Sequence, residues 1–289
     1  LLGSWPAGVT GPPEREFVDR MRGYIQKALK EKKVHTSWIN PSKDYDDAAS
    51  RFVERALAGP NSRSFLPLFL PFQQRIARFG MINSLSQLVL KIASPGVPDF
   101  YRGAELWDLN LVDPDNRRPV DFRLREQLLD EMEPLLACSC PVEERIRALG
   151  LMLEHWEDGR IKLYVTAAGL RLRRRWWETF AGGQYVPLAV EGAAASHLVA
   201  FARVSSGRSV IAVAPRLAAT LCGSRASLPL GPDVWGDTNV TLPENLAQTS
   251  YRNILTGETF SPGATLSAAQ ALRTAPATLL VTQQEDFSG

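Results

Sequence analysis

Apolar residues in the first half of the chain recur at steps of three and four, the spacing of one face of an α-helix. One such stripe lies between Glu14 and Lys32 and consists of Phe17, Met21, Tyr24, Ile25, Ala28 and Leu29. A second stripe follows Asn40-Pro41, a helix-capping residue and a proline suited to the first helical position, and ends at Gly59-Pro60. The pattern predicts two amphipathic helices.

Further helical segments are predicted at 64–80, from Asn83 onward, at about 121–132 and at about 141–156. Pro67 and Pro71 interrupt the first of these early, and Asp121 caps the third. The stretch 94–101 is too rich in proline for a helix. It predicts a short buried strand with a turn on each side.

After Gly159 the spacing of the apolar residues changes. Residues 161–165 alternate and predict a strand, and Thr166 is expected to cap a short helix that reaches about Phe180. Short apolar or alternating runs then follow at 185–190, 198–204, 210–214, 234–242, 251–260 and 277–282, separated by Gly, Ser and Pro. Their spacing predicts an antiparallel β-sandwich, so the fold class is α+β with a boundary near 158–184.

Composition and charge exclude several classes of protein. The 289 residues carry 33 basic and 31 acidic side chains, so no global basic field attracts nucleic acid or anionic lipid. No apolar run approaches the roughly 20 residues that span a bilayer, and the first residues lack the pattern of a signal peptide. Three cysteines and three histidines offer no zinc-finger spacing. We expect a cytoplasmic protein with reduced thiols and no metal, cofactor, nucleic-acid partner or membrane partner.

Residues 102–121 form a polar loop of a length that is usually functional or disordered, and its Trp107 and paired arginines argue against disorder. Aromatic rings stack on the apolar faces of sugars, and carboxylate, amide and guanidinium groups bind the hydroxyls. The candidate substrate-binding residues are Tyr101, Glu105, Trp107, Asp108, Asp115, Asn116, Arg117 and Arg118. The alternative is that the aromatics anchor the loop and that its charged residues satisfy one another.

The segment Pro95-Gly96-Val97-Pro98-Asp99-Phe100-Tyr101-Arg102-Gly103-Ala104-Glu105 resembles the Gly-x-Pro-x-x-Tyr-x-Gly-x-Glu segment at the eighth barrel strand of the α-amylase superfamily, glycoside hydrolase family 13. Its continuation, 105–121, is similar to the maltooligosyltrehalose synthase branch of that family. Two further segments, 34–41 and 160–174, resemble the same branch, and Trp235-Gly236-Asp237-Thr238 is a weaker match.

The resemblance implies a fold and a division into domains. Residues 1–158 would hold the last strand and flanking helices of a catalytic (β/α)8 barrel, 159–183 a junction, and 184–289 a β-sandwich. A single barrel strand cannot close, so its edges would be covered by the missing N-terminal part of the enzyme or by a dimer mate.

The resemblance also implies an activity. This branch isomerises the reducing-end α-1,4 bond of a maltooligosaccharide to an α,α-1,1 bond, by intramolecular transglycosylation in trehalose biosynthesis. The superfamily's three catalytic carboxylates lie after strands four, five and seven, the last in a His-Asp pair. Because none of His35, His155 and His197 precedes Asp, we expect the chain to begin after strand seven, to lack all three carboxylates and to be inactive alone.

The roles of the loop residues remain open at this point. Glu105 is expected to fix the loop more than to touch substrate, and the stretch 115–118 to tie the loop to the next helix. Trp107 and Asp108 fit a substrate wall and a structural anchor equally well. An autonomous glucan-binding or structural module of another α-amylase-superfamily enzyme is the alternative function.

One basic stretch, 171–177, interleaves arginine and tryptophan as some nucleic-acid and membrane ligands do. On a helical wheel, however, Leu170, Leu172, Trp176, Trp177 and Phe180 share one arc, so a packed helix face is expected. Arg173 falls within that arc and should need a carboxylate partner or a path to solvent.

Overall fold

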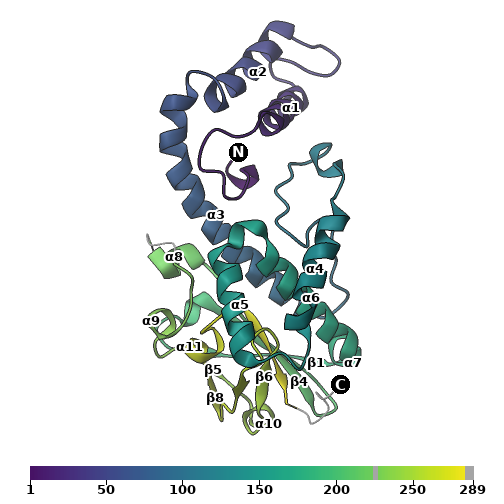
Figure 1. Ribbon diagram of the computed structural model, residues 1–289, viewed down its shortest axis with the longest axis vertical. Coiled ribbons are helices and arrows are strands. Elements are labelled where there is room, and N and C mark those ends of the chain that lie inside the picture. Colours follow the sequence, from purple (N-terminus) through teal and green to yellow (C-terminus); the bar gives the residue numbers. More distant parts are fainter. Residues whose placement is uncertain (224–226, 284–289) are drawn as a thin grey trace. The chain divides into compact units, whose positions relative to one another are not determined.

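The computed structural model describes residues 1–223 and 227–283. They form two compact units in an α+β architecture (Figure 1). The first unit comprises Leu1–Arg78 and Asp108–Val120, and the second comprises Phe79–Trp107 and the chain from Asp121 onward. The expected domains 1–158, 159–183 and 184–289 stay a prediction. The two units divide the loop 102–121 between them.

The first unit is helical. Its elements are η1 (Leu2–Ser4), α1 (Arg15–Lys32), α2 (Lys43–Leu57), the first part of α3 (Ser62–Ala93) and η2 (Asp115–Arg117). Its core contains Trp5, which is 1% exposed and packs edge-on against Phe17 and Phe69, with ring centroids 5.3 and 5.0 Å away. The Trp5 indole donates to the Val9 carbonyl at 2.9 Å, which fixes the chain before α1.

Both amphipathic helices predicted for the first unit are confirmed, but α2 begins later than expected. Its N-cap is Ser42 rather than Asn40. The backbone N–H of Asn40 donates to the Ser37 hydroxyl at 2.9 Å, and that of Ser42 donates to the Thr36 hydroxyl at 3.0 Å. Asn40 therefore belongs to a turn that precedes the helix.

Helix α3 is continuous where the two prolines predicted an interruption. Pro67 and Pro71 lie one turn apart near its start. Each removes one backbone donor, because proline has no N–H. An interior proline costs about 3 kcal/mol. Burial of one large aliphatic side chain stabilises a fold by about 1.5–3 kcal/mol. Three such side chains of α3 are at most 1% exposed, Ile82, Leu85 and Ile92, and their burial offsets the cost of the prolines.

The second unit contains the end of α3 and all the strands that the structure describes. Its helices are α4 (Phe122–Leu136), α5 (Val142–Glu154), η3 (Trp156–Asp158), α6 (Arg160–Arg175), α7 (Trp177–Ala181), η4 (Ala195–His197), α8 (Ala218–Cys222), α9 (Pro232–Trp235), α10 (Glu244–Ala247) and α11 (Ala268–Ala271). Helix α4 is capped as predicted, because the Asp121 carboxylate accepts from the Leu124 N–H at 2.9 Å.

The strands form two antiparallel sheets. They are β1 (Gln184–Pro187), β2 (Val190–Glu191), β3 (Leu198–Ser205), β4 (Arg208–Pro215), β5 (Asn239–Thr241), β6 (Tyr251–Asn253), β7 (Thr259–Phe260), β8 (Thr265–Ser267) and β9 (Thr278–Thr282). One sheet has the order β1-β3-β4-β9-β6-β7 and the other β2-β5-β8. The antiparallel strands predicted for the second half are thus confirmed, although 234–242 and 251–260 contain shorter strands than their apolar runs suggested.

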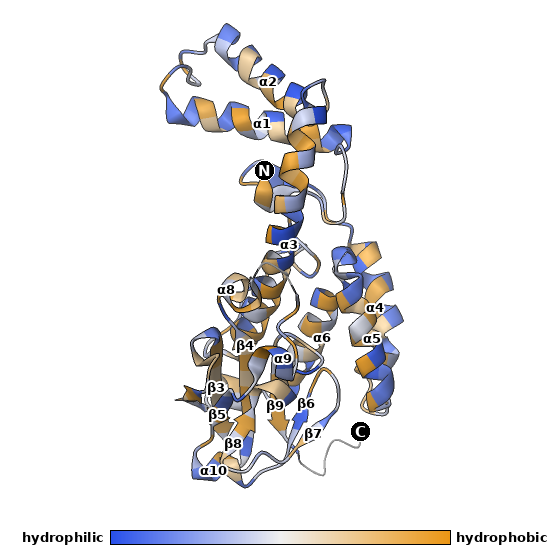
Figure 2. Ribbon diagram, turned by 90° about the vertical axis from the view of Figure 1, so that its left-hand side faces the viewer, coloured by the Kyte–Doolittle hydropathy of each residue, from blue (hydrophilic) through white to orange (hydrophobic). Residues whose placement is uncertain are grey.

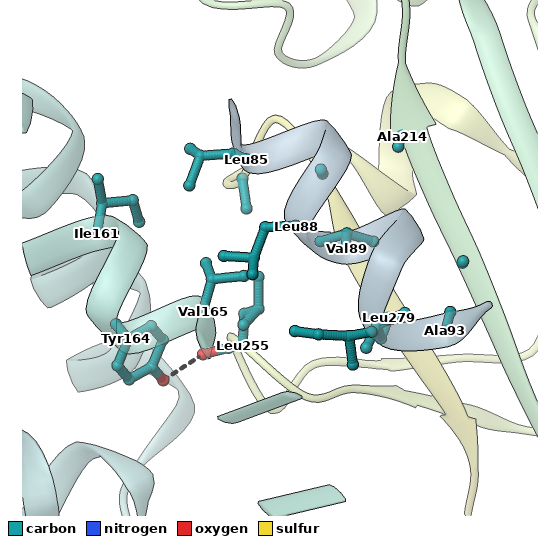
Figure 3. Packing of buried hydrophobic residues seen from close by; sticks show 14 of the residues in the cluster. Leu85, Leu88, Val89, Ala93, Ile161, Tyr164, Val165, Ala214, Leu255 and Leu279 are labelled. Atoms are coloured by element: carbon teal, nitrogen blue, oxygen red, sulfur yellow. Dashed lines mark hydrogen bonds between the residues drawn. The ribbon is translucent and has the colours of Figure 1, made fainter. Parts of the chain in front are cut away.

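The central strands of the six-stranded sheet, β3, β4 and β9, are buried on both faces. Ile211, Val213 and Leu280 share one apolar cluster with Val240 and Leu266 of the small sheet. On the opposite face Ala212, Ala214 and Leu279 share another cluster with residues of α3, α4 and α6. Figure 2 shows hydrophobic residues along α3 and β4, and Figure 3 shows Leu88 and Val89 of α3 close to this helix-covered face.

The strand predicted at 161–165 is wrong, because this segment is the first part of α6. Ile161, Tyr164 and Val165 are buried at helical spacing, and Figure 3 shows them facing the α3 cluster. The Asp158 carboxylate accepts from the Arg160 N–H at 2.9 Å at the start of the helix. Thr166 does not cap a helix, since its hydroxyl donates to the Lys162 carbonyl at 2.7 Å, one turn back.

The buried strand predicted at 94–101 is also not formed in this structure. Pro95 and Pro98 have no N–H to donate to a ladder, and Val97 is 96% exposed. Side chains bind backbone carbonyls of this segment instead: Lys91 donates to the Asp99 carbonyl at 2.9 Å, and Arg173 donates to the carbonyls of Gly96 and, at 3.4 Å, Ser94. Arg173 also donates to the Ile92 carbonyl of α3 at 2.5 Å.

Arg173 therefore satisfies its charge on backbone carbonyls and not on a carboxylate. Its guanidinium also lies 5.0 Å from the centre of the Phe180 ring. The single helix face expected for 170–180 is divided at Trp176, and Trp177 is 63% exposed. No helix within the described residues is long and apolar enough to cross a bilayer.

Candidate functional site

The predicted site residues fall into two groups. Tyr101, Glu105 and Trp107 belong to the second unit. The members in the first unit are Asp108, Asp115, Asn116, Arg117 and Arg118. Each group has its own set of hydrogen bonds.

Trp107 is held by groups from the second half of the chain. Its indole N–H donates to the Trp156 carbonyl at 2.6 Å, and the two rings meet edge-on with centroids 6.0 Å apart. The Lys162 ammonium lies 5.6 Å from the centre of the Trp107 ring and donates to the Leu106 carbonyl at 3.0 Å. These contacts give Trp107 an anchoring role while leaving part of its surface accessible.

Glu105 is tied to the start of α4. The Arg125 guanidinium donates to its carboxylate at 3.0 Å and to the carbonyls of Gly103 and Asp121 at 2.8 and 2.9 Å. The pair is largely shielded, with side-chain exposures of 16% for Arg125 and 28% for Glu105. Glu105 thus fixes the loop, whereas Tyr101 beside it is 51% exposed.

Asp115 organises the loop of the first unit. Both its oxygens accept from Arg20 of α1 at 2.8 Å, and one also accepts from the Leu111 N–H at 2.7 Å. The hydrogen bonds from Arg20 and from Leu111, opposed by burial, hold the pKa of the Asp115 carboxyl below its usual range, and the same pairing raises the pKa of Arg20. Asp115 is therefore a carboxylate with its acceptors occupied, not a proton donor.

The other loop residues of the first unit differ in how far they are engaged. Arg118 pairs with Glu16 and donates to the Asn110 side chain at 3.1 Å. Arg117 is exposed and pairs with Asp113. Asp108 is exposed and accepts from the Asn110 N–H at 3.2 Å. The Asn116 side-chain oxygen is buried and has no hydrogen-bond partner among the described residues.

This geometry separates groups that fix the loop from groups that a ligand could reach. Hydrogen bonds within the protein occupy polar side-chain atoms of Glu105, Trp107, Asp115 and Arg118. Exposed surface that a ligand could reach remains on Tyr101, Asp108 and Arg117. The Asn116 oxygen has an unused acceptor among the described residues, but this oxygen is buried. Within residues 1–223 and 227–283, no group of three His, Cys, Asp or Glu side chains is arranged to hold a metal ion.

Sequence reasoning missed the partners that hold the loop, namely Arg20, Arg125 and Lys162. Each lies on a predicted element, outside the apolar positions that define it. Basic residues are common at such positions and do not indicate a particular partner. Only the spacing from Asp121 to Arg125, one helical turn, could have suggested that Arg125 returns to the loop.

Solved structures share this fold over almost the whole chain. The maltooligosyltrehalose synthase of Arthrobacter ramosus aligns with 98% of this chain and 31% of its own, with 31% sequence identity and a TM-score of 0.73. A hypothetical maltooligosyl trehalose synthase of Sulfolobus tokodaii aligns with 97% of this chain and 30% of its own, with 26% identity and a TM-score of 0.64. The fold is thus similar to that of one part of these synthases.

A curated relative from Mycobacterium tuberculosis H37Rv, provisionally named a maltooligosyl trehalose synthase, is 31% identical over 281 residues, which is 97% of this chain. The chain spans about 30% of the length of that relative. No family model matches. The chain is related to the C-terminal portion of the maltooligosyl trehalose synthases, as the segments at 95–121 indicated.

Proposed function

We propose that this chain is part of an enzyme that isomerises the reducing-end α-1,4 bond of a maltooligosaccharide to an α,α-1,1 bond. The observation that supports this most is the combination of 31% identity and a TM-score of 0.73 with the Arthrobacter ramosus enzyme over 98% of the chain. Because the chain corresponds to less than a third of that enzyme, the activity is a property of the whole protein.

Intramolecular transglycosylation with retention needs two carboxyl groups about 5 Å apart, one as nucleophile and one as acid/base. Two of the loop carboxylates, Glu105 and Asp115, do not suit these roles. Glu105 is bound by Arg125 and Asp115 by Arg20, and the pKa of Asp115 is lowered, which opposes proton donation. We therefore place the catalytic carboxylates outside this chain and propose that the chain by itself is inactive.

The contribution of this chain would be a wall of the substrate site. An isomerase must keep the released glucose in place and exclude water until the sugar attacks again. In the second unit, Glu105 and Trp107 tie down their part of the loop, and Tyr101 has an exposed ring for sugar stacking. In the first unit, Asp115 ties down the other part. Each part by itself has the hydrogen bonds that a rigid segment of such a wall needs. Asp108, Asn116 and Arg117 are the proposed polar contacts to maltooligosaccharide.

The activity is tested on the complete gene product and on this chain in parallel, with maltopentaose as substrate. We expect the complete protein to remove reducing ends without releasing an equivalent amount of glucose, and this chain alone to change nothing. Loss of reducing ends with the chain alone would refute its inactivity. Unchanged reducing ends, or glucose release in their place, with the complete protein would refute the isomerase function.

A glucan-binding role is the second candidate, and it is favoured by exposed aromatics in the second unit. Trp177 is 63% and Tyr185 is 47% exposed. Titration of the chain with maltoheptaose tests it: heat that disappears in Trp177→Ala but persists in Arg174→Gln would support binding at this surface. The absence of heat with the unaltered chain would exclude it.

A further inference from the structure

The first unit contains an apolar cavity of about 580 Å³. Its lining comes chiefly from α1, α2 and the first part of α3, and Figure 2 shows hydrophobic residues on all three helices. The lining residues include Met21, Tyr24, Phe52, Leu57, Phe65 and Leu68. No charged side chain occurs among the described residues that line the cavity, so it is unsuited to binding an ion.

One part of this lining is buried and another part is open to solvent. Met21, Val53 and Leu57 are buried and belong to the hydrophobic core of the first unit. Phe52 of α2 and Leu68 of α3, by contrast, are 73% and 80% exposed. The cavity therefore joins the core of the unit to large apolar side chains that water can reach.

An exposed apolar patch of this kind marks an interaction site. The buried centre of a protein–protein interface is depleted in charged residues and enriched in aromatic residues and methionine, as this lining is. A small polar ligand would find few groups to bind, since the Ser64 hydroxyl already donates to the Asn61 carbonyl at 3.0 Å. Apolar side chains of a protein segment fit the cavity better.

The length of the relatives indicates which protein segment this is. The chain spans about 30% of the length of its Mycobacterium tuberculosis relative and is related to the C-terminal portion of such proteins. A complete protein of that length has a large portion before Leu1. Leu1 itself lines the cavity, so that portion starts at the cavity and is present there at a high effective concentration.

We propose that the apolar cavity of the first unit is the docking site for the portion of the complete protein that precedes Leu1. Apolar side chains of that portion enter beside Phe52, Phe65 and Leu68 and remove them from water, which is the dominant favourable contribution in most protein association. The proposal rests on the proposed function only in that the chain is part of a longer enzyme. It gives these residues a role in an interface and none in the chemical reaction.

Cysteine labelling tests the proposal. Leu68→Cys and Phe52→Cys are introduced separately into this chain and into the complete gene product. Their reaction rates with N-ethylmaleimide are followed by peptide mass spectrometry, which separates the new thiol from the three native cysteines. We expect each new thiol to react at least about tenfold more slowly in the complete protein, because it must wait for local opening of the interface.

The matched control is Asp47→Cys. Asp47 is exposed on α2, as Phe52 is, but does not line the cavity. Its thiol should react at about the same rate in this chain and in the complete protein. Circular dichroism of each variant checks folding.

A second variant, Leu68→Glu, tests the same surface through stability. Because Leu68 is exposed in this chain, the substitution should leave the thermal midpoint of the chain nearly unchanged. In the complete protein the carboxylate would be buried without a partner, which is costly, so the midpoint should fall. An equal fall in the chain and in the complete protein would contradict the proposal.

Equal reactivity of the Leu68→Cys and Phe52→Cys thiols in the chain and in the complete protein overturns the proposal. So does protection that already occurs in this chain and grows with its concentration, because a second copy then covers the cavity. The isomerase assay fails independently of these results. Slow labelling in a complete protein without isomerase activity refutes only the proposed activity, and rapid labelling in an active one refutes only the interface.

Discussion

The two compact units are held together by different physical means. In the first unit the loop that contains Asp115 is joined to α1 by ion pairs and hydrogen bonds, chiefly from Arg20. In the second unit the central strands β4 and β9 are buried on both faces by apolar side chains. Apolar burial is not directional and acts over a whole surface, whereas a charged pair acts at one point and responds to pH. The comparison predicts different responses to mutation and to titration.

The largest effect is expected from a cavity in the sheet. Ile211 is fully buried in β4, and Ile211→Ala should destabilise the second unit by about 2–5 kcal/mol, from lost burial and the cavity that remains. Urea denaturation followed by tryptophan fluorescence measures this. Leu217→Ala is the control, since Leu217 is 53% exposed and its removal should change stability little. Equal effects of the two substitutions would contradict the sheet's role as the core.

The second unit should lose stability at alkaline pH. Burial raises the pKa of Tyr164 to about 12, and its hydroxyl donates to the Leu255 carbonyl at 2.7 Å (Figure 3). The unfolded chain releases this proton near pH ~10, so between pH ~10 and the folded pKa the native state binds more protons. Stability therefore falls as pH rises through this window, by about 2–3 kcal/mol in all.

Urea midpoints measured from pH 8 to 12 test the alkaline loss. The variant Tyr164→Phe lacks the ionising group and should show a shallower decline than the unaltered chain. An identical decline in both would assign the alkaline loss to other groups.

In the first unit, Arg20→Met should release the loop rather than unfold the molecule. The Asp115 carboxylate would stay shielded from solvent but would lose the guanidinium that binds it, which should destabilise the loop by about 1.5–3 kcal/mol. Hydrogen exchange at the Leu111 amide, which donates to Asp115, should become faster, while exchange in β4 stays unchanged. Arg22→Met provides a more exposed arginine on the same helix as a control. Faster exchange in β4 would show that the two regions do not respond separately.

Acid should loosen the same loop. The pKa of Asp115 is lowered in the folded state, so its stabilising contribution is present above the unfolded value of about 3.9 and is lost as pH falls through the folded pKa. Amide exchange at Leu111, corrected for its intrinsic pH dependence, should therefore show less protection below that range. Asp115→Asn should remove the pH dependence; a persistent transition would assign it to another group.

The smallest effect is expected at Trp107. Trp107→Phe replaces the indole by a smaller aromatic ring and removes the N–H that donates to the Trp156 carbonyl; loss of this hydrogen bond should cost about 0.5–1.5 kcal/mol. Under the proposed function, the same variant of the complete protein should release more glucose per isomerisation, because a loosened loop would admit water to the substrate site. Unchanged product ratios would leave Trp107 with a role in folding alone.

The helices and antiparallel strands were predictable because their apolar periods are local. The stripe at Phe17 and Met21 and the cap at Asp121 depend only on neighbours within a few residues, and both were confirmed. Segment 161–165 was not predictable in this way, since alternation over five residues also fits the start of a helix whose Ile161, Tyr164 and Val165 face one side. The strand at 94–101 failed for another reason: a strand needs a ladder partner, and the described chain offers none there.

The candidate site was likewise predictable only in the features that depend on nearby residues. The loop 102–121 was recognised from its composition and its resemblance, and the loop-fixing role expected for Glu105 agrees with its bond to Arg125. The sequence could not reveal that Asp115 would be occupied by Arg20, which lies 95 residues away. Pairing over such a distance depends on the folded path of the chain.

By itself the sequence determined the helical stripes, the antiparallel strands of the second half and the relation to the C-terminal portion of maltooligosyl trehalose synthases. These properties are written in local periodicity and short motifs. Only the tertiary structure decided that β4 is buried on both faces and that Asp115 of the polar loop is bound by Arg20 of α1. Those features depend on which distant side chains meet, and the free energy of each charge is set by the partners and the burial that it finds there.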